Sequence, residues 1–108
     1  ESGVWKFLKY VKLKDKKLLL YGYGMICQLI MANYDLSELN IVAISDKKFE
    51  DSNDTEINGI KTVTPDKLST VDFDIVLSSL YTNVPIYYCL NYQNLTQNIV
   101  SIFPKEEN

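Results

Sequence analysis

The chain contains no histidine and no arginine, and these two absences restrict its chemistry more than any residue that is present. Without histidine there is no Ser-His-Asp or Cys-His nucleophile pair and no zinc site with a histidine ligand. Without arginine there is no guanidinium group to bind a phosphate through two parallel hydrogen bonds. Any catalysis would therefore depend on lysine, aspartate, glutamate, tyrosine or cysteine.

Cysteine and long apolar runs are scarce as well. Cys27 and Cys89 lie far apart in the sequence within apolar segments, which fits reduced, buried thiols better than a disulfide framework. We therefore expect a cytoplasmic protein. No run of about 18 apolar residues and no signal-peptide layout is present, so we expect neither a membrane span nor export.

The length of 108 residues and the formal charge of −3 predict one domain, residues 1–108, without a nucleic-acid surface. Six lysines fall within the first 17 residues, but the remaining lysines are scattered among acidic residues. Apolar residues and lysines recur at helical spacing between residues 4 and 14. We therefore expect residues 1–16 to form an amphipathic helix that packs on the edge of the sheet.

Short apolar segments alternate with segments of helical periodicity along the rest of the chain. Strands that are apolar at nearly every position are typical of a parallel sheet covered on both faces. With right-handed crossovers, the pattern predicts an α/β fold, a Rossmann-like three-layer αβα sandwich with a five-stranded parallel sheet in the order 3-2-1-4-5. The five expected strands are residues 17–21, 39–45, 60–63, 74–78 and 98–103, with a tight turn at Asn58-Gly59.

The segment from Leu18 to Cys27 changes from an apolar strand to a helix across two closely spaced glycines. Gly22 and Gly24 match the first two glycines of the dinucleotide-binding fingerprint, while Cys27 occupies the position of the third. The start of a helix directs unpaired N–H groups and a positive dipole end toward an anion. The alternative is that the two glycines serve only the turn.

Asp46 lies 24 residues after Gly22, at the end of the second expected strand. A carboxylate in this position can accept hydrogen bonds from both hydroxyls of a ribose, although a solvated acid at the start of a polar loop is the simpler alternative. Lys47 and Lys48 follow, and without arginine an unphosphorylated ribose is favoured over one with a 2′-phosphate.

The loop after the fourth expected strand should reach the same crevice, at the carboxyl ends of the strands. Its serines could bind a ligand or cap the next helix, and Tyr81 could stack on a base or cover the core. We expect Tyr21, Tyr87, Tyr88 and Tyr92 to be packing residues whose hydroxyls reach solvent, rather than cofactor contacts. No catalytic residue and no metal ligand is expected, and the candidate cofactor-binding residues are Gly22, Tyr23, Gly24, Met25, Asp46, Lys47, Ser78, Ser79 and Tyr81.

Four phrases of the sequence, between residues 18 and 104, resemble the Rossmann-like domain of bacterial polysaccharide and glycan biosynthesis proteins. In that group the domain adjoins a sugar acyltransferase, an FkbM-type or sugar methyltransferase, or a nucleotide-sugar epimerase or dehydratase. The resemblance implies a nucleotide or nucleotide-sugar pocket and places catalysis in the neighbouring unit. The phrases are Leu-Tyr-Gly-Tyr-Gly, Val-Ala-Ile-Ser-Asp, Ile-Asn-Gly-Ile-Lys-Thr-Val-Thr-Pro-Asp-Lys-Leu and Phe-Asp-Ile-Val-Leu-Ser-Ser.

These observations favour a module that binds a nucleotide or nucleotide-sugar and has no catalytic residues of its own. Two alternatives stay open: a fragment of an NAD-dependent oxidoreductase, and a degenerate domain that serves only assembly. The expected partners are the nucleotide ligand, with NAD as a further possibility, and a catalytic domain in the same or a neighbouring chain. A homo-oligomer is compatible with the sequence.

Overall fold

The computed structural model describes residues 13–33 and 36–102. Most of the expected N-terminal helix, residues 1–12, lies outside these ranges. Near its end, Leu13–Asp15 form a 3-10 helix, η1. No helix in the described ranges has the length and apolar character needed to cross a membrane.

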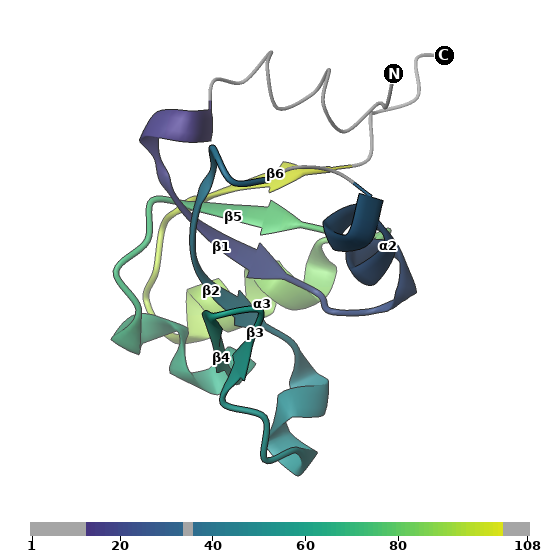
Figure 1. Cartoon of the computed structure of the whole chain (residues 1–108). Helices are drawn as coiled ribbons and strands as arrows, with labels where there is room; N and C mark the ends of the chain where they lie inside the picture. Colours follow the sequence, from purple (N-terminus) through teal and green to yellow (C-terminus); the bar gives the residue numbers. More distant parts are fainter. Residues whose placement is uncertain (1–12, 34–35, 103–108) are drawn as a thin grey trace.

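One six-stranded sheet forms the centre of the domain, with the strand order β3-β4-β2-β1-β5-β6 (Figure 1). All neighbouring strands pair in parallel except β3 and β4, which are antiparallel. The strands are β1 (Lys17–Tyr21), β2 (Asn40–Ser45), β3 (Glu56–Ile57), β4 (Ile60–Val63), β5 (Ile75–Ser78) and β6 (Asn98–Ser101).

The α/β class and the largely parallel sheet are confirmed, but the sheet has six strands in the order β3-β4-β2-β1-β5-β6 rather than the predicted five in the order 3-2-1-4-5. The five predicted strands keep their relative order, as β4-β2-β1-β5-β6. The additional strand is β3, whose two residues are not predicted to form a strand. Asn58 and Gly59 have φ values of 51° and 82°, and the turn they form folds Glu56–Ile57 back onto β4. A strand of two residues is too short to produce a recognisable hydropathy pattern.

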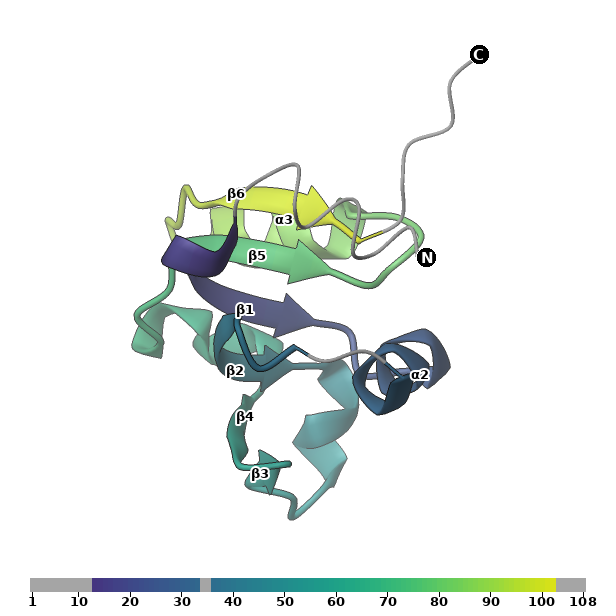
Figure 2. The same ribbon diagram turned by 45° about the horizontal axis from the view of Figure 1, so that its top comes forward.

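Helices cover both faces of the sheet (Figure 2). On one face, α2 (Met25–Asn33), η1 and η2 (Lys47–Asp51) contribute to a core around Leu18 and Leu20. On the other face, α3 (Val84–Tyr92) and η3 (Pro65–Thr70) pack on a second core around Leu19.

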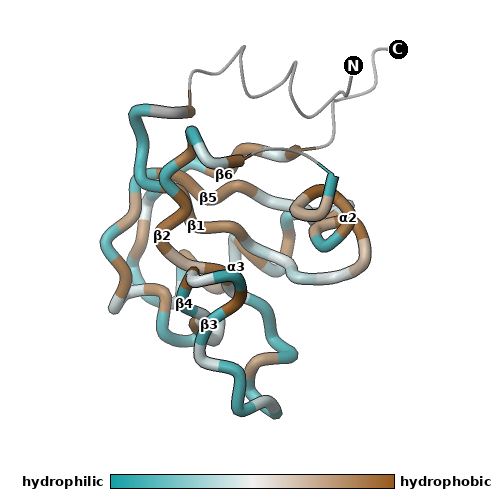
Figure 3. The backbone as a smooth tube through the Cα atoms, viewed as in Figure 1, coloured by the Kyte–Doolittle hydropathy of each residue, from teal (hydrophilic) through white to brown (hydrophobic). Residues whose placement is uncertain are grey.

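Strand β1 explains why the hydropathy pattern of the strands lacks alternation. Leu18, Leu19 and Leu20 are all buried, although successive side chains point to opposite faces. Because each face has its own core, every position of the strand must be apolar. The hydrophobic segments accordingly concentrate along the central strands in Figure 3.

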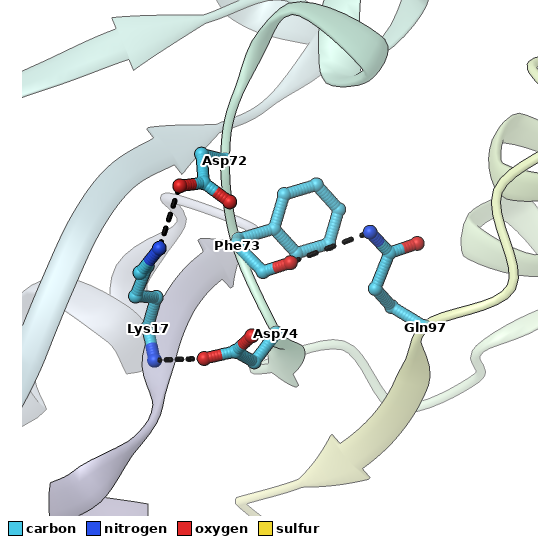
Figure 4. Close-up of polar contacts among 5 residues, drawn as sticks. All are labelled: Lys17, Asp72, Phe73, Asp74 and Gln97. Carbon is cyan, nitrogen blue, oxygen red and sulfur yellow. Dashed lines mark hydrogen bonds and ion pairs between the residues drawn. The ribbon is translucent and has the colours of Figure 1, made fainter.

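Polar contacts hold the amino end of β1 (Figure 4). The N–H of Lys17 donates to Oδ2 of Asp74 at 2.8 Å, and the N–H of Asp74 donates to the Lys17 carbonyl oxygen at 2.7 Å. Lys17 Nζ also lies 2.6 Å from Oδ2 of Asp72 in an exposed ion pair, and this hydrogen bond raises the pKa of the lysine. Gln97 Nε2 donates to the carbonyl oxygen of Phe73 at 3.3 Å. These polar groups at the amino end of the sheet are therefore hydrogen-bonded to one another.

Candidate functional site

The turn from β1 to α2 lies at the carboxyl end of the sheet and begins with Gly22. Its N–H donates to the carbonyl oxygen of Ser45 at 2.8 Å, and its φ is +100°. A Cβ on Gly22 would lie 2.6 Å from Oγ of Ser79 and 2.8 Å from Cδ2 of Leu80. The fold therefore requires glycine here, both for the backbone conformation and for the close approach of the loop after β5.

Gly24 differs from Gly22 in both respects. Its φ is not positive, and apart from its two chain neighbours no residue has a heavy atom within 4 Å of the position that a Cβ would occupy. The N–H of Gln28 donates to the Gly24 carbonyl oxygen at 3.0 Å, so the N–H groups of Met25 to Cys27 precede the first hydrogen bond of α2. Nothing in the fold requires glycine at this position, and its absent side chain leaves the start of α2 accessible.

Asp46 connects the glycine turn to the segment after β2. One carboxylate oxygen accepts the N–H of Tyr23 at 2.6 Å, and the other accepts the N–H of Lys48 at 2.9 Å. Asp46 is thereby the N-cap of η2. The Asp46 carboxylate therefore lies at the turn, as predicted for a ribose-binding residue, but its observed hydrogen bonds stabilise the fold. Each carboxylate oxygen can still accept a second hydrogen bond, for example from a hydroxyl.

The side chain of Tyr23 packs toward η2. Its ring centroid lies 6.0 Å from that of Phe49, which is buried, and Lys48 Nζ lies 5.1 Å from the Tyr23 centroid. These contacts place a cation beside the turn, in a position suited to an anionic ligand. Both lysines follow Asp46 in the sequence, but Lys48 is not among the nine candidate binding residues, because its position beside the Tyr23 ring depends on the fold.

Ser78 and Ser79 are buried and engage the fold. Oγ of Ser79 lies 2.6 Å from the carbonyl oxygen of Gly22 and 3.2 Å from that of Tyr21. Oγ of Ser78 donates to Oδ1 of Asn83 at 2.8 Å and accepts the N–H of Leu80 at 3.1 Å. Ser79 therefore fixes the loop after β5 against the glycine turn, while Ser78 holds the loop itself together, and both contacts favour a supporting role.

Met25 and Tyr81 are largely exposed, with 75% and 87% of their surface accessible. Tyr81 does not cover the core, which removes one of its two predicted roles. Both side chains belong to the two segments that meet at the glycine turn. They are available to contact a ligand at its rim.

The other tyrosines divide into two groups. Tyr21 is 6% exposed and packs in the second core, as predicted, and burial raises its pKa. The prediction is wrong for Tyr87, Tyr88 and Tyr92, which are 62%, 74% and 89% exposed. Ile86 and Leu90 occupy the core-facing positions of α3, so the tyrosines lie on its outer face.

Cys27 takes the place of the third glycine of the fingerprint and packs in the first core, 2% exposed. Burial raises the pKa of its thiol to about 11, and the charge of Asp46 acts in the same direction. A thiol with this pKa is protonated at neutral pH and is a poor nucleophile. In the described ranges, no three Cys, Asp or Glu side chains form a group that could hold a metal ion.

The two glycines should respond differently to alanine. Gly22→Ala should lower the free energy of unfolding by about 1 to 3 kcal/mol because of the positive φ alone. The steric clash of the Cβ should add to this loss. Gly24→Ala should change it by less than about 1 kcal/mol. Chemical denaturation of both variants measures the difference. Equal losses would contradict the contrast between the two positions.

The Cys27 thiol should react slowly in the native protein. At about pH 8 a pKa near 11 leaves roughly one thiolate in a thousand, and the rate should rise about tenfold per pH unit in mildly alkaline buffer. Reaction of a Cys89→Ser variant with a disulfide reagent isolates this thiol, and the same variant in denaturant provides the control. A rate that levels off near pH 8 would show that the pKa is not raised.

Comparison with known proteins gives one result that covers the site. A family model described as C2185-like, N-terminal, matches residues 14–86, well over half of the chain. This range contains the glycine turn, Asp46 and the loop after β5. Searches of curated proteins and of solved structures gave no significant match. The chain belongs to the C2185-like N-terminal family.

Proposed function

We propose that this domain binds a nucleotide or nucleotide-sugar across the turn from Gly22 to Met25, and that the chemistry belongs to another unit. The observation that carries the proposal is Gly24, a glycine that neither backbone conformation nor packing requires. A glycine without a role in the fold is explained by the close approach of a ligand to the backbone. A phosphate is the natural ligand of the free N–H groups at the start of α2.

The charges around the turn support a ligand with both a phosphate and a ribose. The Asp46 carboxylate repels a phosphate, but its remaining lone pairs can accept ribose hydroxyls. Lys48, close to the Tyr23 ring, offsets the carboxylate and attracts the phosphate. The ribose would therefore lie toward Asp46 and the phosphate toward the helix start. The resemblance to polysaccharide-biosynthesis domains supports a sugar on the distal phosphate, and a cytoplasmic site of action.

The side chains near the turn support binding without catalysis. Cys27 is a protonated thiol, and burial raises the pKa of Tyr21 as well. Neither group can exchange a proton readily near neutral pH. Ser78 and Ser79 are committed to contacts with the backbone and with Asn83. Proton transfer would have to be supplied by a second domain, in the same chain or a neighbouring one.

A panel of uridine, adenine, guanine and cytidine diphosphates and their sugar conjugates tests the proposal by thermal melting. Binding at a hundredfold excess over Kd should raise the free energy of unfolding by about 2.7 kcal/mol, a readable shift for a domain of this size. Gly24→Val should remove the shift while changing the unliganded stability by about 1 kcal/mol or less.

Ala32→Val is the matched control, because Ala32 is exposed near the other end of the same helix. It should retain the ligand-induced shift. If no compound in the panel shifts the melting temperature at millimolar concentration, nucleotide binding is wrong and a role in assembly takes its place. If Gly24→Val binds as well as the wild type, the ligand does not lie on this turn.

A further inference from the structure

The charged residues of this chain are distributed very unevenly. They make up 23% of the sequence, yet none lies between Asp74 and Lys105. This stretch contains β5, α3 and β6, which together form one side of the domain. Depletion of charge and enrichment of tyrosine characterise the centres of protein interfaces.

Large apolar and aromatic side chains are exposed on α3. Val84 is 55% exposed, in addition to Tyr87, Tyr88 and Tyr92. Beside them, a hollow of about 840 Å³ runs between α3 and the last strand of the sheet. Its lining includes Val84, Tyr87, Tyr88, Asn91, Gln97 and Ile99, and we call it the α3–β6 groove.

The two edges of the sheet are protected differently. The β3–β4 edge carries Glu56 and Lys61 and consists of a very short hairpin, both of which discourage pairing with another chain. β6 is the last strand at the opposite edge and carries neither a charge nor a proline. Within the described ranges, no strand pairs with the outer side of residues 98–100.

We infer that the α3–β6 groove is the interface of a symmetric homodimer, in which β6 pairs antiparallel with β6 of a second copy. A two-fold axis brings the same patch of both copies together, so any charge close to the axis would face its own copy and be repelled. The groove carries none. Its polar groups are amides and hydroxyls, which both donate and accept hydrogen bonds and can therefore pair with their own copies.

A partner of different chemistry is less well matched to this surface. A charged partner would find no opposite charge in the groove and would lose solvation on docking. The dimer would also leave the glycine turn open, since none of the nine candidate binding residues lines the groove. The inference therefore does not depend on the proposed nucleotide site.

Analytical ultracentrifugation over a wide range of concentration tests the dimer directly. The wild-type chain should form dimers, and Tyr87→Glu and Tyr88→Glu should each weaken association by about a hundredfold through like-charge repulsion. Tyr92→Glu is the matched control, because Tyr92 is exposed on the same helix but does not line the groove, and it should dimerise like the wild type. Circular dichroism verifies that each variant is folded. If Tyr87→Glu does not fold, the comparison of Tyr88→Glu with the wild type tests the dimer.

Mixing Tyr87→Glu with Tyr87→Lys distinguishes a symmetric dimer from other association. Each variant alone should be largely monomeric, whereas the mixture should form heterodimers, because opposite charges then share the interface. A wild-type chain that remains monomeric at every concentration would overturn the inference and leave the groove to another partner. Equal disruption by Tyr92→Glu, or no recovery on mixing, would show that the chain associates through another surface.

Discussion

The hydrogen bond from the Tyr23 N–H to the Asp46 carboxylate organises the carboxyl end of this sheet. It joins the turn after β1 to the segment after β2, and the same carboxylate starts η2 through the N–H of Lys48. The loop after β5 reaches the turn as well, because Ser79 contacts the carbonyl oxygen of Gly22. Gly22 permits this three-way contact, since its positive φ and missing side chain leave room for Ser79 and Leu80.

This arrangement gives the two glycines separate roles. Gly22 is enclosed by the fold, while Gly24 is open at the start of α2. The carboxylate, the lysine and the free N–H groups then lie within one small region whose charges suit a ribose joined to a phosphate. At the other end of the sheet, reciprocal hydrogen bonds between Lys17 and Asp74 join the start of β1 to the segment before β5. The proposed ligand site thus lies where strands end and helices begin.

The sequence predicts the α/β class and the parallel core, because two buried faces demand apolar residues at every position of a strand such as β1. It does not predict β3, whose two residues depend on the turn at Asn58 and Gly59 and on pairing with β4. The spacing from Gly22 singles out Asp46, but its role in linking the turn to η2 depends on the tertiary hydrogen bond from Tyr23. The tyrosines of α3 illustrate a different limit: tyrosine is both apolar and polar, so composition alone does not assign it to the core or the surface.

An amide-resolved NMR titration tests the central claim, that the turn braced by Asp46 is the ligand site. The protein would be labelled with nitrogen-15 and titrated with the nucleotide that gives the largest melting shift. We expect the amide signals of Tyr23, Gly24, Met25 and Lys48 to move in parallel, while those of α3 and β6 stay in place. A titration that instead moves signals along α3 and β6, with no change at the turn, would contradict the claim.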